Sequence, residues 1–361
     1  MGAIATFLNG RAYKQDELLT SGKYKVLRVG NFYTNDRWYY SDLELADKFY
    51  ADKGDLLYTW SASFGPHIWL GDKVIYHYHI WKVVLSEYIL KDFALQILEK
   101  DKQNILSHPN GSTMIHVTKV DMENKQICIP CLAEQQKIGN FFKYLDETIT
   151  LHQRKLESMK LLKKSLLQKM FPKSGETVPE VRFPGFTDAW EQRKLDKIAN
   201  RYDNLRIPVT ASDRISGTTP YYGANGIQDY VKGFTHDGEF VLIAEDGAND
   251  LHNYPVQYVN GKVWVNNHAH VLQGINGLVD TRFLGYAFSQ VNMEAILVGG
   301  SRAKLNASDL MKIEIRLPRL MQEQQHIATF LHSLDQTITL HQRKVEALQK
   351  LKKSLLQQMF V

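Results

Sequence analysis

The sequence predicts an α+β protein: two mixed α/β domains joined by two long antiparallel helices that pair as a coiled coil. An internal repeat is the first observation behind this fold class. Residues 134–171 return at 323–360 with a constant offset of 189 residues, and 25 of the 38 aligned positions are identical. A repeat of this kind predicts a frame with pseudo-two-fold internal symmetry. The second observation is a coiled-coil pattern within both copies, and the third is a mixture of strand and turn patterns in the segments that precede them.

Within each copy, the core positions alternate in steps of four and three over four heptads, which is the spacing of a coiled-coil seam. In the first copy these positions are Ile138, Phe142, Leu145, Ile149, His152, Leu156, Met159, Lys163, Leu166 and Met170, and in the second they are Ile327, Leu331, Leu334, Ile338, His341, Val345, Leu348, Lys352, Leu355 and Met359. Each copy predicts a rod of roughly 50–55 Å at 1.5 Å per residue. Because one chain carries both rods, each is the expected partner of the other.

Two seam positions are polar in both copies. His152 corresponds to His341, and Lys163 corresponds to Lys352. A buried polar residue in a seam lowers stability but fixes the register and the partner of the helix. Alternatively, the lysines extend to solvent at a frayed helix end and the histidines tolerate partial burial. Both interpretations are open from the sequence.

The length predicts two or more domains, because 361 residues exceed what one core usually spans. The composition is ordinary for a soluble protein, and we expect the protein to be cytoplasmic. The net charge of +5 and the pI near 8.9 are a mild indication of a polyanionic partner. No apolar run approaches the twenty residues that span a bilayer. Cys128 and Cys131 are the two cysteines, and a lone CxxC supplies only half of a zinc site. The equivalent stretch of the second half has no cysteine, so we expect a structural role and no metal site.

The predicted order of parts is a first domain at 1–132, a long helix at 133–171, a linker at 172–194, a second domain at 195–321 and a second long helix at 322–361. In the first domain we expect strands at 25–32, 54–65, 73–85 and 125–130 and a helix at 92–100. In the second we expect strands at 239–250, 261–272 and 313–318 and a helix at 281–291. Residues 207–231 are polar and rich in turn signals. The two domains share this plan but little sequence.

Two dissimilar domains on a repeated frame suggest a constant scaffold that carries two variable DNA-recognition modules. Arginine pairs with guanine and asparagine with adenine in the major groove, while lysine, tyrosine and serine contact phosphates. The candidate residues in the first domain are Asn9, Arg11, Tyr13, Lys14, Arg28, Asn31, Trp60, Ser61 and Ser63, and those in the second are Tyr221, Tyr222, Asn225, Asn249, Asn267, Arg302 and Lys304. Taken singly, such a residue is more often a turn residue or a solvated charge.

Other motifs give little support to chemistry within this chain. The pairs His77/His79 and His268/His270 have the spacing of one strand face, which could place metal ligands, but a packed or DNA-facing histidine is the better interpretation. The chain has no Pro-Pro pair for an amino-methyltransferase loop, no phosphate-binding P-loop and no Pro-Asp start of a nuclease cluster. We therefore expect no catalytic residues, and any chemistry is assigned to a partner.

Five motifs, together with the paired rods that end in LKKSLLQ-MF, resemble the specificity subunit of a type I restriction-modification enzyme. They are WEQRKL (190–195), YYGANGI (221–227), VLIAEDGAN (241–249), WVNNHAHVL (264–272) and the segment 302–310. The resemblance covers essentially the whole chain. It implies two target-recognition domains, each of which reads one half of a split double-stranded DNA sequence. It also implies two modification subunits that methylate adenine with S-adenosylmethionine, and restriction subunits that use ATP and Mg²⁺. These cofactors belong to the partners.

One departure from the family pattern concerns the first domain. The second domain is preceded by RFPGFTDAWEQRKL (182–195), whereas Met1 aligns with Leu195, so the first domain lacks this lead. We expect this difference to affect docking at the amino-terminal side.

Two other function classes were compared with this one. A self-contained DNA-modifying enzyme with a divergent catalytic site is disfavoured by the missing motifs, and a methylation assay on the isolated chain separates the two. A coiled-coil structural protein leaves the turn-rich, dissimilar domains unexplained, and a mobility shift with random DNA tests it.

Overall fold

The computed structural model describes residues 1–33, 35–61, 63–107, 117–297 and 304–360. The chain forms two compact units, and neither is a continuous segment. Unit 1 contains residues 1–154 and 342–361, and unit 2 contains residues 155–341. The units therefore cut across the predicted linear ranges, because each long helix contributes one part to each unit.

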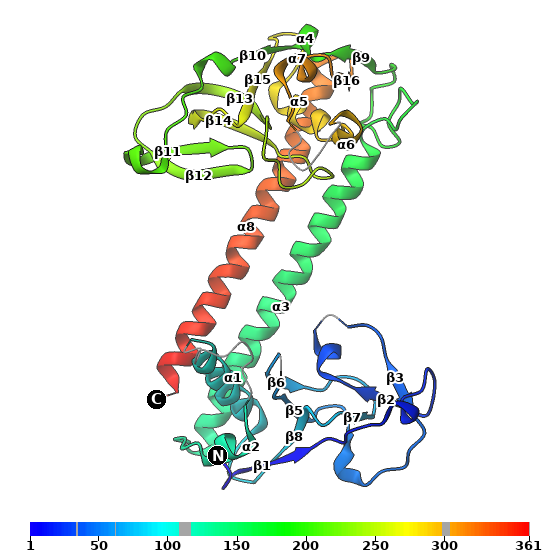
Figure 1. The fold of residues 1–361 in the computed structure, drawn as a ribbon, viewed down its shortest axis with the longest axis vertical. Helices are drawn as coiled ribbons and strands as arrows, with labels where there is room; N and C mark the ends of the chain where they lie inside the picture. Colours follow the sequence, from blue (N-terminus) through cyan, green and yellow to red (C-terminus); the bar gives the residue numbers. More distant parts are fainter. Residues whose placement is uncertain (34, 62, 108–116, 298–303, 361) are drawn as a thin grey trace. The chain divides into compact units, whose positions relative to one another are not determined.

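Unit 1 holds two four-stranded sheets (Figure 1). The first sheet is antiparallel in the order β1 (Ala5–Asn9), β8 (Ile80–Leu85), β5 (Leu56–Thr59) and β6 (Gly65–Ile68). The second has the order β3 (Tyr39–Ser41), β2 (Tyr24–Leu27), β7 (Val74–Tyr76) and β4 (Tyr50–Ala51), with β2 parallel to β7. Short 3-10 helices η1 (Gln15–Glu17), η2 (Val29–Phe32) and η3 (Asp47–Phe49) lie between the strands in the chain.

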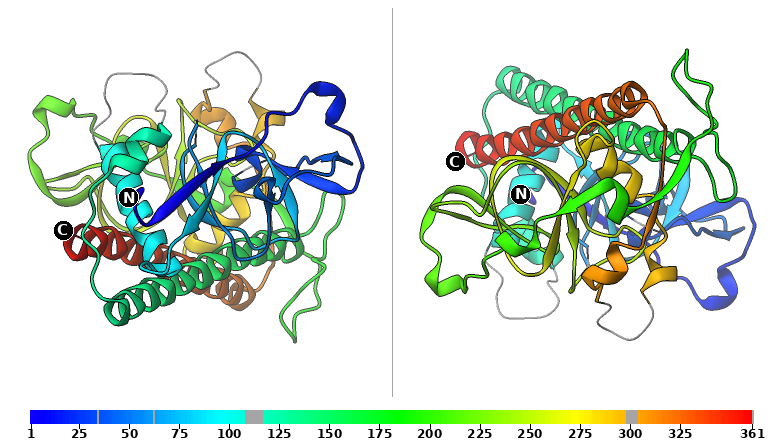
Figure 2. Two further views of the ribbon diagram at one scale, coloured as in Figure 1. Left: turned by 90° about the horizontal axis from the view of Figure 1, so that it is seen from below. Right: turned by 90° about the horizontal axis from the view of Figure 1, so that it is seen from above.

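The helices of unit 1 are α1 (Lys91–Ser107), α2 (Lys119–Asn124), the start of α3 (Leu132–Lys169) and the end of α8 (Met321–Met359). The carboxyl-terminal end of the chain packs in the core of this unit: Phe360 lies 5.3 Å from Phe93 and 5.9 Å from Phe142, measured between ring centroids. The red end of α8 lies beside the first turns of α3 in Figure 2. The first domain is therefore closed by the last twenty residues of the chain.

Unit 2 is built on a six-stranded sheet in the order β10 (Ala199–Arg201), β15 (Ala269–Gly274), β13 (His236–Ala244), β14 (Val256–Val265), β11 (Ser216–Gly223) and β12 (Gly226–Val231). A separate two-stranded sheet pairs β9 (Glu191–Lys194) with β16 (Glu314–Leu317). The helices that belong wholly to this unit are α4 (Leu195–Ile198), α5 (Thr281–Phe288), α6 (Met293–Ile296) and α7 (Ala307–Leu310), with 3-10 helices η4 (Asp203–Leu205) and η5 (Ala211–Asp213).

Helix α5 supplies several buried residues to the core of unit 2. It begins at Thr281, and the side chain of the preceding residue, Asp280, accepts a hydrogen bond from the Phe283 N–H and so caps the helix. Its apolar side packs on β13, and Phe283 also contacts Phe171 and Trp190 at centroid distances of 5.7 and 5.8 Å. The end of α3 and the start of α8 complete this core. The second domain is thus closed by the last turns of the first long helix.

The two long helices are antiparallel within each unit, as the seam pattern predicts. Lys352 of α8 forms an ion pair of 2.6 Å with Asp146 of α3 in unit 1. Lys163 of α3 forms the equivalent pair of 2.5 Å with Asp335 of α8 in unit 2. The offset of 189 residues relates both partners, so the repeat makes the same bridge twice. Both lysines are therefore paired across the two helices, and their role in setting the register stays a prediction. Among the predicted seam positions, Met359 alone is exposed, because Leu356 and Phe360 turn into the core instead.

A repeated glutamine attaches each long helix to its own domain. Gln135 is 1% exposed; its Nε2 donates to the Tyr88 and Pro130 carbonyls, and its Oε1 accepts from the Leu90 N–H. Gln324, which is fully buried, makes the matching three bonds to Leu278, Pro318 and Asp280. In both units the amide therefore fixes the start of the rod to the loop that precedes the domain helix.

The structure confirms the predicted fold class, but several predicted strands were wrong. Residues 54–65 and 261–272 were each expected to form one strand; the first range instead contains β5 and the start of β6, and the second contains a turn between β14 and β15. Residues 73–85 form two strands separated by a turn at 77–79, so the run of β-favouring residues is not continuous. Residues 125–130 form no strand, because no other strand pairs with them in the described part of unit 1. The polar, turn-rich stretch 207–231 contains the hairpin of β11 and β12; its turn residues are Ala224 and Asn225, and Gly226, the first residue of β12, has φ 115°. No helix in the described part of the chain is both long enough and apolar enough to cross a membrane.

Candidate nucleic-acid interface

Arg206 organises a cluster of polar loops in unit 2. Its Nη1 donates to the Glu245 carboxylate at 2.7 Å, to the Ala269 carbonyl at 2.9 Å and to the Asn267 carbonyl at 3.4 Å. Its Nε donates to the Asp203 carbonyl at 3.1 Å. The planar guanidinium thereby joins η4, the loop after β13 and the turn between β14 and β15. An arginine suits this position because its donors are fixed in one plane.

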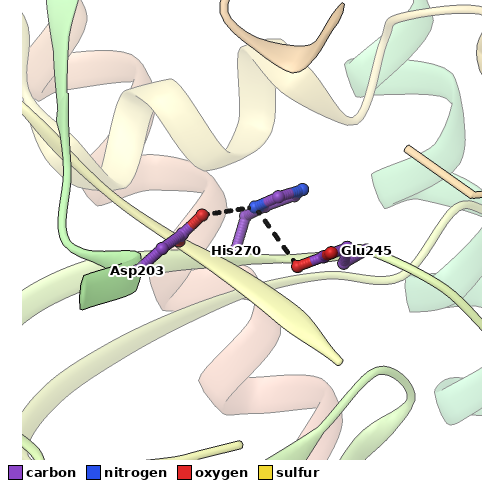
Figure 3. A group of neighbouring side chains, drawn as sticks. All are labelled: Asp203, Glu245 and His270. Atoms are coloured by element: carbon purple, nitrogen blue, oxygen red, sulfur yellow. Dashed lines mark hydrogen bonds and ion pairs between the residues drawn. The ribbon is translucent and has the colours of Figure 1, made fainter. Parts of the chain in front are cut away.

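A buried group of charges lies next to this arginine (Figure 3). The Nδ1 atom of His270 is 2.6 Å from the Asp203 carboxylate and 3.8 Å from the Glu245 carboxylate, and its Nε2 is 2.8 Å from the Leu305 carbonyl. Both ring nitrogens therefore lie within hydrogen-bond distance of oxygen acceptors. Burial tends to raise the pKa of Asp203, but hydrogen bonds from His270, the Val271 N–H and Arg201 hold this pKa at about 2.

The same three side chains also have the composition of a metal site, since their ligand atoms all lie within 4.8 Å of one another. Their existing partners favour an ion-pair network instead. Arg206 and Lys304 already bring two cations to Glu245, at 2.7 and 3.2 Å. Both nitrogens of His270 already contact oxygen atoms of this chain, at the Asp203 carboxylate and the Leu305 carbonyl. The pKa of Glu245 is lowered because the hydrogen bonds from Arg206 and Lys304 and the charge of His270 outweigh its burial.

Asn225 connects the β11–β12 turn to the loop that follows β13. Its Nδ2 donates to the Gly247 carbonyl at 2.8 Å, and its Oδ1 accepts from the Asn249 N–H at 3.0 Å. His268 reaches the same loop through a 2.5 Å contact with Asp246. Two sequence-predicted residues, Asn225 and Asn249, are therefore adjacent in the structure, and the side chain of Asn225 positions the loop.

The other candidates of unit 2 differ in their exposure. Tyr221 is a correction: it is 1% exposed, and its hydroxyl is bonded to the backbone of Val209, so it is a core residue. Tyr222 is half-buried against a small apolar cluster of the sheet. Asn267 and Lys304 are exposed beside the Arg206 cluster. Arg302 lies outside the described residues.

In unit 1, several candidates surround the turn between β7 and β8, which holds His77 and His79. The Arg11 N–H donates to the Tyr76 carbonyl, and the Tyr78 N–H donates to the Arg11 carbonyl. Trp60 donates from its indole to the Tyr78 carbonyl at 2.9 Å. Because these two histidines lie in a turn, the prediction that they share a strand face was wrong. Gly10 is needed beside this turn, since an added Cβ would approach the His77 carbonyl to 2.4 Å.

The charged and amide side chains of unit 1 are partly held by their neighbours. Arg11 forms a two-bond pair with Glu17, at 3.1 and 2.6 Å, and lies over the Tyr13 ring. Arg28 lies over the ring of Tyr39. Asn31 uses its whole amide within its loop, with bonds to Arg28, Asn35 and Arg37 backbone atoms. Of the remaining candidates, Lys14 and Ser63 are exposed, and Asn9 and Ser61 are exposed or half-buried near the strand ends.

Two histidines near these loops carry no charge at neutral pH. Burial, together with the nearby charge of Lys102, lowers the pKa of His67 to about 4. Burial, together with His79 and Arg28, lowers the pKa of His77 to about 4. His67 stacks on Phe32 with a centroid distance of 4.1 Å and contacts the Tyr33 hydroxyl. These rings are therefore packing and hydrogen-bonding groups rather than phosphate-binding cations.

Three of the residues that hold the unit 2 cluster together, Asp203, Arg206 and Glu245, were not identified from the sequence, and His270 was identified only as a packed or DNA-facing histidine. A signal was available, because Glu245 lies in the motif VLIAEDGAN and His270 in the motif WVNNHAHVL. Both motifs were noted as wholes, and the buried charges within them were not paired.

Known proteins support one interpretation of this arrangement. Residues 1–161 and 187–350 match the family described as the type I restriction modification DNA specificity domain. A putative type I restriction enzyme specificity subunit of Haemophilus influenzae, S.HindORF215P, is 47% identical over 148 residues, which are 41% of this chain and 38% of that protein. The MjaVIII specificity subunit of Methanocaldococcus jannaschii is 23% identical over 342 residues, or 85% of this chain and 78% of that protein.

A solved structure shows the same fold. The crystal structure of the S subunit of a type I restriction-modification system from M. genitalium has a TM-score of 0.72 and 17% sequence identity, and the match covers 100% of this chain and 94% of that one. At this level of identity, the similarity shows the arrangement of the backbone and does not identify contact residues.

Proposed function

The chain belongs to the family of type I restriction-modification DNA specificity domains, and on this premise we propose that it reads a double-stranded DNA target in two halves, one with each domain. Its role is that of a specificity subunit, which recognises DNA and is not itself an enzyme. The observation that carries the proposal is the convergence of polar loops in each unit. In unit 2 these loops meet at Arg206, and in unit 1 they meet at the turn of residues 77–79.

We assign the contacts with DNA to exposed or half-buried side chains at these loops. The proposed residues are Arg11, Lys14, Arg28, Asn31, Trp60, Ser61 and Ser63 in unit 1, and Tyr222, Asn225, Asn249, Asn267 and Lys304 in unit 2. Arg302, which lies outside the described residues, is proposed from its sequence position alone. Buried ion pairs such as Arg206–Glu245 hold the loops in one conformation, which lowers the entropy that binding has to overcome. Asn31 and Asn225 act chiefly through the loop conformations that their amides fix.

The proposed partners are two modification subunits and the restriction subunits of the same system, in the cytoplasm. S-adenosylmethionine, ATP and Mg²⁺ then bind to these subunits and not to this chain. The remaining proposed partner is the double-stranded DNA target, and the net charge of +5 on this chain favours binding to such a polyanion.

Exchange of one domain tests the proposal. Residues 1–132 are replaced by the first domain of another specificity subunit, the protein is co-expressed with its modification subunit, and methyladenine is mapped across the genome. We expect one half of the methylated sequence to change and the other half to stay. A control chimera exchanges residues 195–321 and should change the opposite half. If both halves change with either exchange, or if the isolated chain methylates DNA, the proposal is wrong.

A further inference from the structure

A groove of about 640 Å³ lies on unit 1 between β6, α1 and α3, which is room enough for a large side chain. Its lining includes Ile68 of β6, Asp92 and Gln96 of α1, and Lys143 and Asp146 of α3. Gln96 is 1% exposed, and its Oε1 atom has no hydrogen-bond partner among the described residues. Buried polar atoms without a partner are rare in folded proteins. The groove therefore borders on an acceptor that the described chain does not use.

The internal repeat identifies the corresponding site in unit 2. Helices α1 and α5 each begin one residue after the backbone N–H that the repeated glutamine binds. Counted from that point, Gln96 corresponds to Tyr286. Aligned on their strand-pairing registers, the two sheets place Ile68 of β6 where Tyr258 of β14 lies. The lining of the groove thus has a counterpart of different side chains in unit 2.

In unit 2 two tyrosines occupy this site. The Tyr286 hydroxyl donates to Oδ2 of Asp335 at 2.7 Å. Lys163 pairs with Oδ1 of the same carboxylate and lies over the Tyr286 ring, with Nζ 5.7 Å from the ring centroid. The Tyr258 hydroxyl accepts a hydrogen bond from Nη2 of Arg282 at 3.1 Å, and this guanidinium lies over the Tyr258 ring. Each phenol is therefore held by one hydrogen bond and one cation.

Unit 1 has the carboxylate and the cation of this site but no phenol. Lys352 pairs with Oδ1 of Asp146 at 2.6 Å. The Oδ2 atom, whose counterpart accepts from Tyr286 in unit 2, receives no hydrogen bond from the described residues. Gln96 stands at the position of Tyr286 and is too short to fill the same space. Unit 1 thus has the acceptor and the cation for a tyrosine that its own sequence does not supply.

We propose that this groove of unit 1 binds a tyrosine side chain presented by a second polypeptide. The ring takes the place that the Tyr286 ring has in unit 2, beside Lys352, and its hydroxyl donates to Oδ2 of Asp146. The terminal torsion of a glutamine is soft, so Gln96 can turn its Oε1 toward a further donor of the bound segment. Three acidic and three basic side chains line the groove, and such a lining does not attract a polyanion. The proposal is independent of which bases the domains read.

Nuclear magnetic resonance of methyl groups in the full chain tests this with a blocked tripeptide, acetyl-Ala-Tyr-Ala-amide. We expect the methyl signals of Ile68 and Leu95, which both line the groove, to shift during the titration. The signal of Leu340, the repeat equivalent of Leu151 in unit 2, should stay fixed. A tripeptide with phenylalanine in place of tyrosine should bind roughly tenfold more weakly, because it cannot donate to Asp146.

The variant Gln96→Tyr fills the groove from within the chain. Its new side chain has the position and the acceptor that Tyr286 has in unit 2, so the variant should fold and should lose the shifts caused by the tripeptide. The matched control is Asn104→Tyr, at an exposed position of the same helix outside the groove, which should keep these shifts.

Four results would overturn the proposal. The first is a shift of equal size in the parent chain and in Gln96→Tyr, because the tripeptide then binds elsewhere. The second is equal affinity for the tyrosine and phenylalanine tripeptides, since the hydroxyl then makes no bond. The third is the same set of shifts with thymidine monophosphate, which would identify a nucleic-acid site instead. The fourth is the absence of any shift up to the solubility limit of the tripeptide.

Discussion

At the scale of single residues, Arg206 and its neighbours show how buried charge is used in unit 2. Arg206 and Glu245 are 15% and 14% exposed, and Asp203 is 5% exposed. Charges at this depth are costly unless each is paired and hydrogen-bonded, and here each one is. The group therefore contributes to a defined loop conformation more than to net stability.

Substitution of Arg206 by alanine should lower the free energy of unfolding of unit 2 by about 3 kcal/mol, because Glu245 is left buried without its partner. The variant Arg206→Lys should have a free energy of unfolding between those of the parent chain and of Arg206→Ala, since lysine keeps the charge but lacks the planar donors. Hydrogen exchange at the amides of β13 and β15, which belong to unit 2, measures this change. Arg201→Ala is the control: that side chain is 40% exposed, and its loss should cost below about 1 kcal/mol.

The histidines of unit 1 predict a dependence of stability on pH. His67 and His77 have pKa values of about 4 in the folded chain, against about 6.5 when exposed. Between these values the unfolded state binds more protons, so the free energy of unfolding of unit 1 falls as the pH falls from 6.5 to 4. We expect a loss of about 1–3 kcal/mol for each histidine, after allowance for partial solvent exposure.

The double variant His67→Gln, His77→Gln should flatten this pH dependence. Intrinsic fluorescence reports mainly on unit 1, because Trp38, Trp60, Trp69 and Trp81 lie there and only Trp190 and Trp264 lie in unit 2. Chemical denaturation at several pH values between 7.5 and 4.5 is the measurement. An unchanged slope in the variant would show that other groups cause the dependence.

The sequence revealed much less about these residues than about the frame. Exposed residues such as Asn267 and Lys304 were found because their types suit DNA, and their neighbours in space were unknown. Tyr221 was misassigned because its burial depends on a hydrogen bond with Val209, twelve residues earlier in the chain. The charges around Arg206 come from four separate segments, and no spacing in the sequence connects them.

At the scale of elements, the long helices were predictable because a heptad pattern is local and repeated. The lysines of the seam could not be interpreted alone, since their partners Asp146 and Asp335 belong to the other helix. The strands were predicted less well, because pairing decides them. Residues 125–130 and 313–318 have similar apolar patterns, yet only the second range has a strand beside it, namely β9.

Charge reversal tests the interhelical bridge of unit 1. Asp146→Lys and Lys352→Asp should each destabilise the unit, and the double variant should recover part of the loss because the pair is restored with opposite polarity. We expect a coupling free energy of about 1 kcal/mol, as for a partly exposed pair. The pair Glu157–Lys160, which lies within one helix and is 66% and 47% exposed, should show half of this or less. Equal coupling in both pairs would contradict a role in setting the register.

At the scale of the whole molecule, each unit combines parts that are distant in the sequence. Unit 1 takes its last residues from 342–361, and unit 2 takes the end of α3 from residue 155 onward. Leu356 is fully buried and Phe360 is 8% exposed, both in the core of unit 1. The repeat explains this exchange: two similar helices that run antiparallel place the end of each beside the other's domain.

Deletion of residues 342–361 should therefore destabilise the domain at the opposite end of the sequence. We expect unit 1 to lose several kcal/mol, since each large buried side chain contributes about 3 kcal/mol or more. Hydrogen exchange should rise across 91–107 and 132–154 and stay slow in β13 and β15 of unit 2. Substitution of Gln357 by alanine, at an exposed position of the same segment, is the control and should change neither unit. Faster exchange in unit 2 but not in unit 1 would contradict the assignment of segments.

Because each unit contains segments from both halves of the sequence, packing should hold the two halves together even when the chain between them is cut. Gly175 lies in an exposed turn at φ 85° with open space around its Cβ position, so a protease site there would be accessible. After cleavage, the first fragment would still supply most of unit 1 and the end of α3, and the second would supply most of unit 2 and the end of α8. Neither fragment could leave without opening two cores. A nicked molecule should therefore elute as one species and separate only in denaturant.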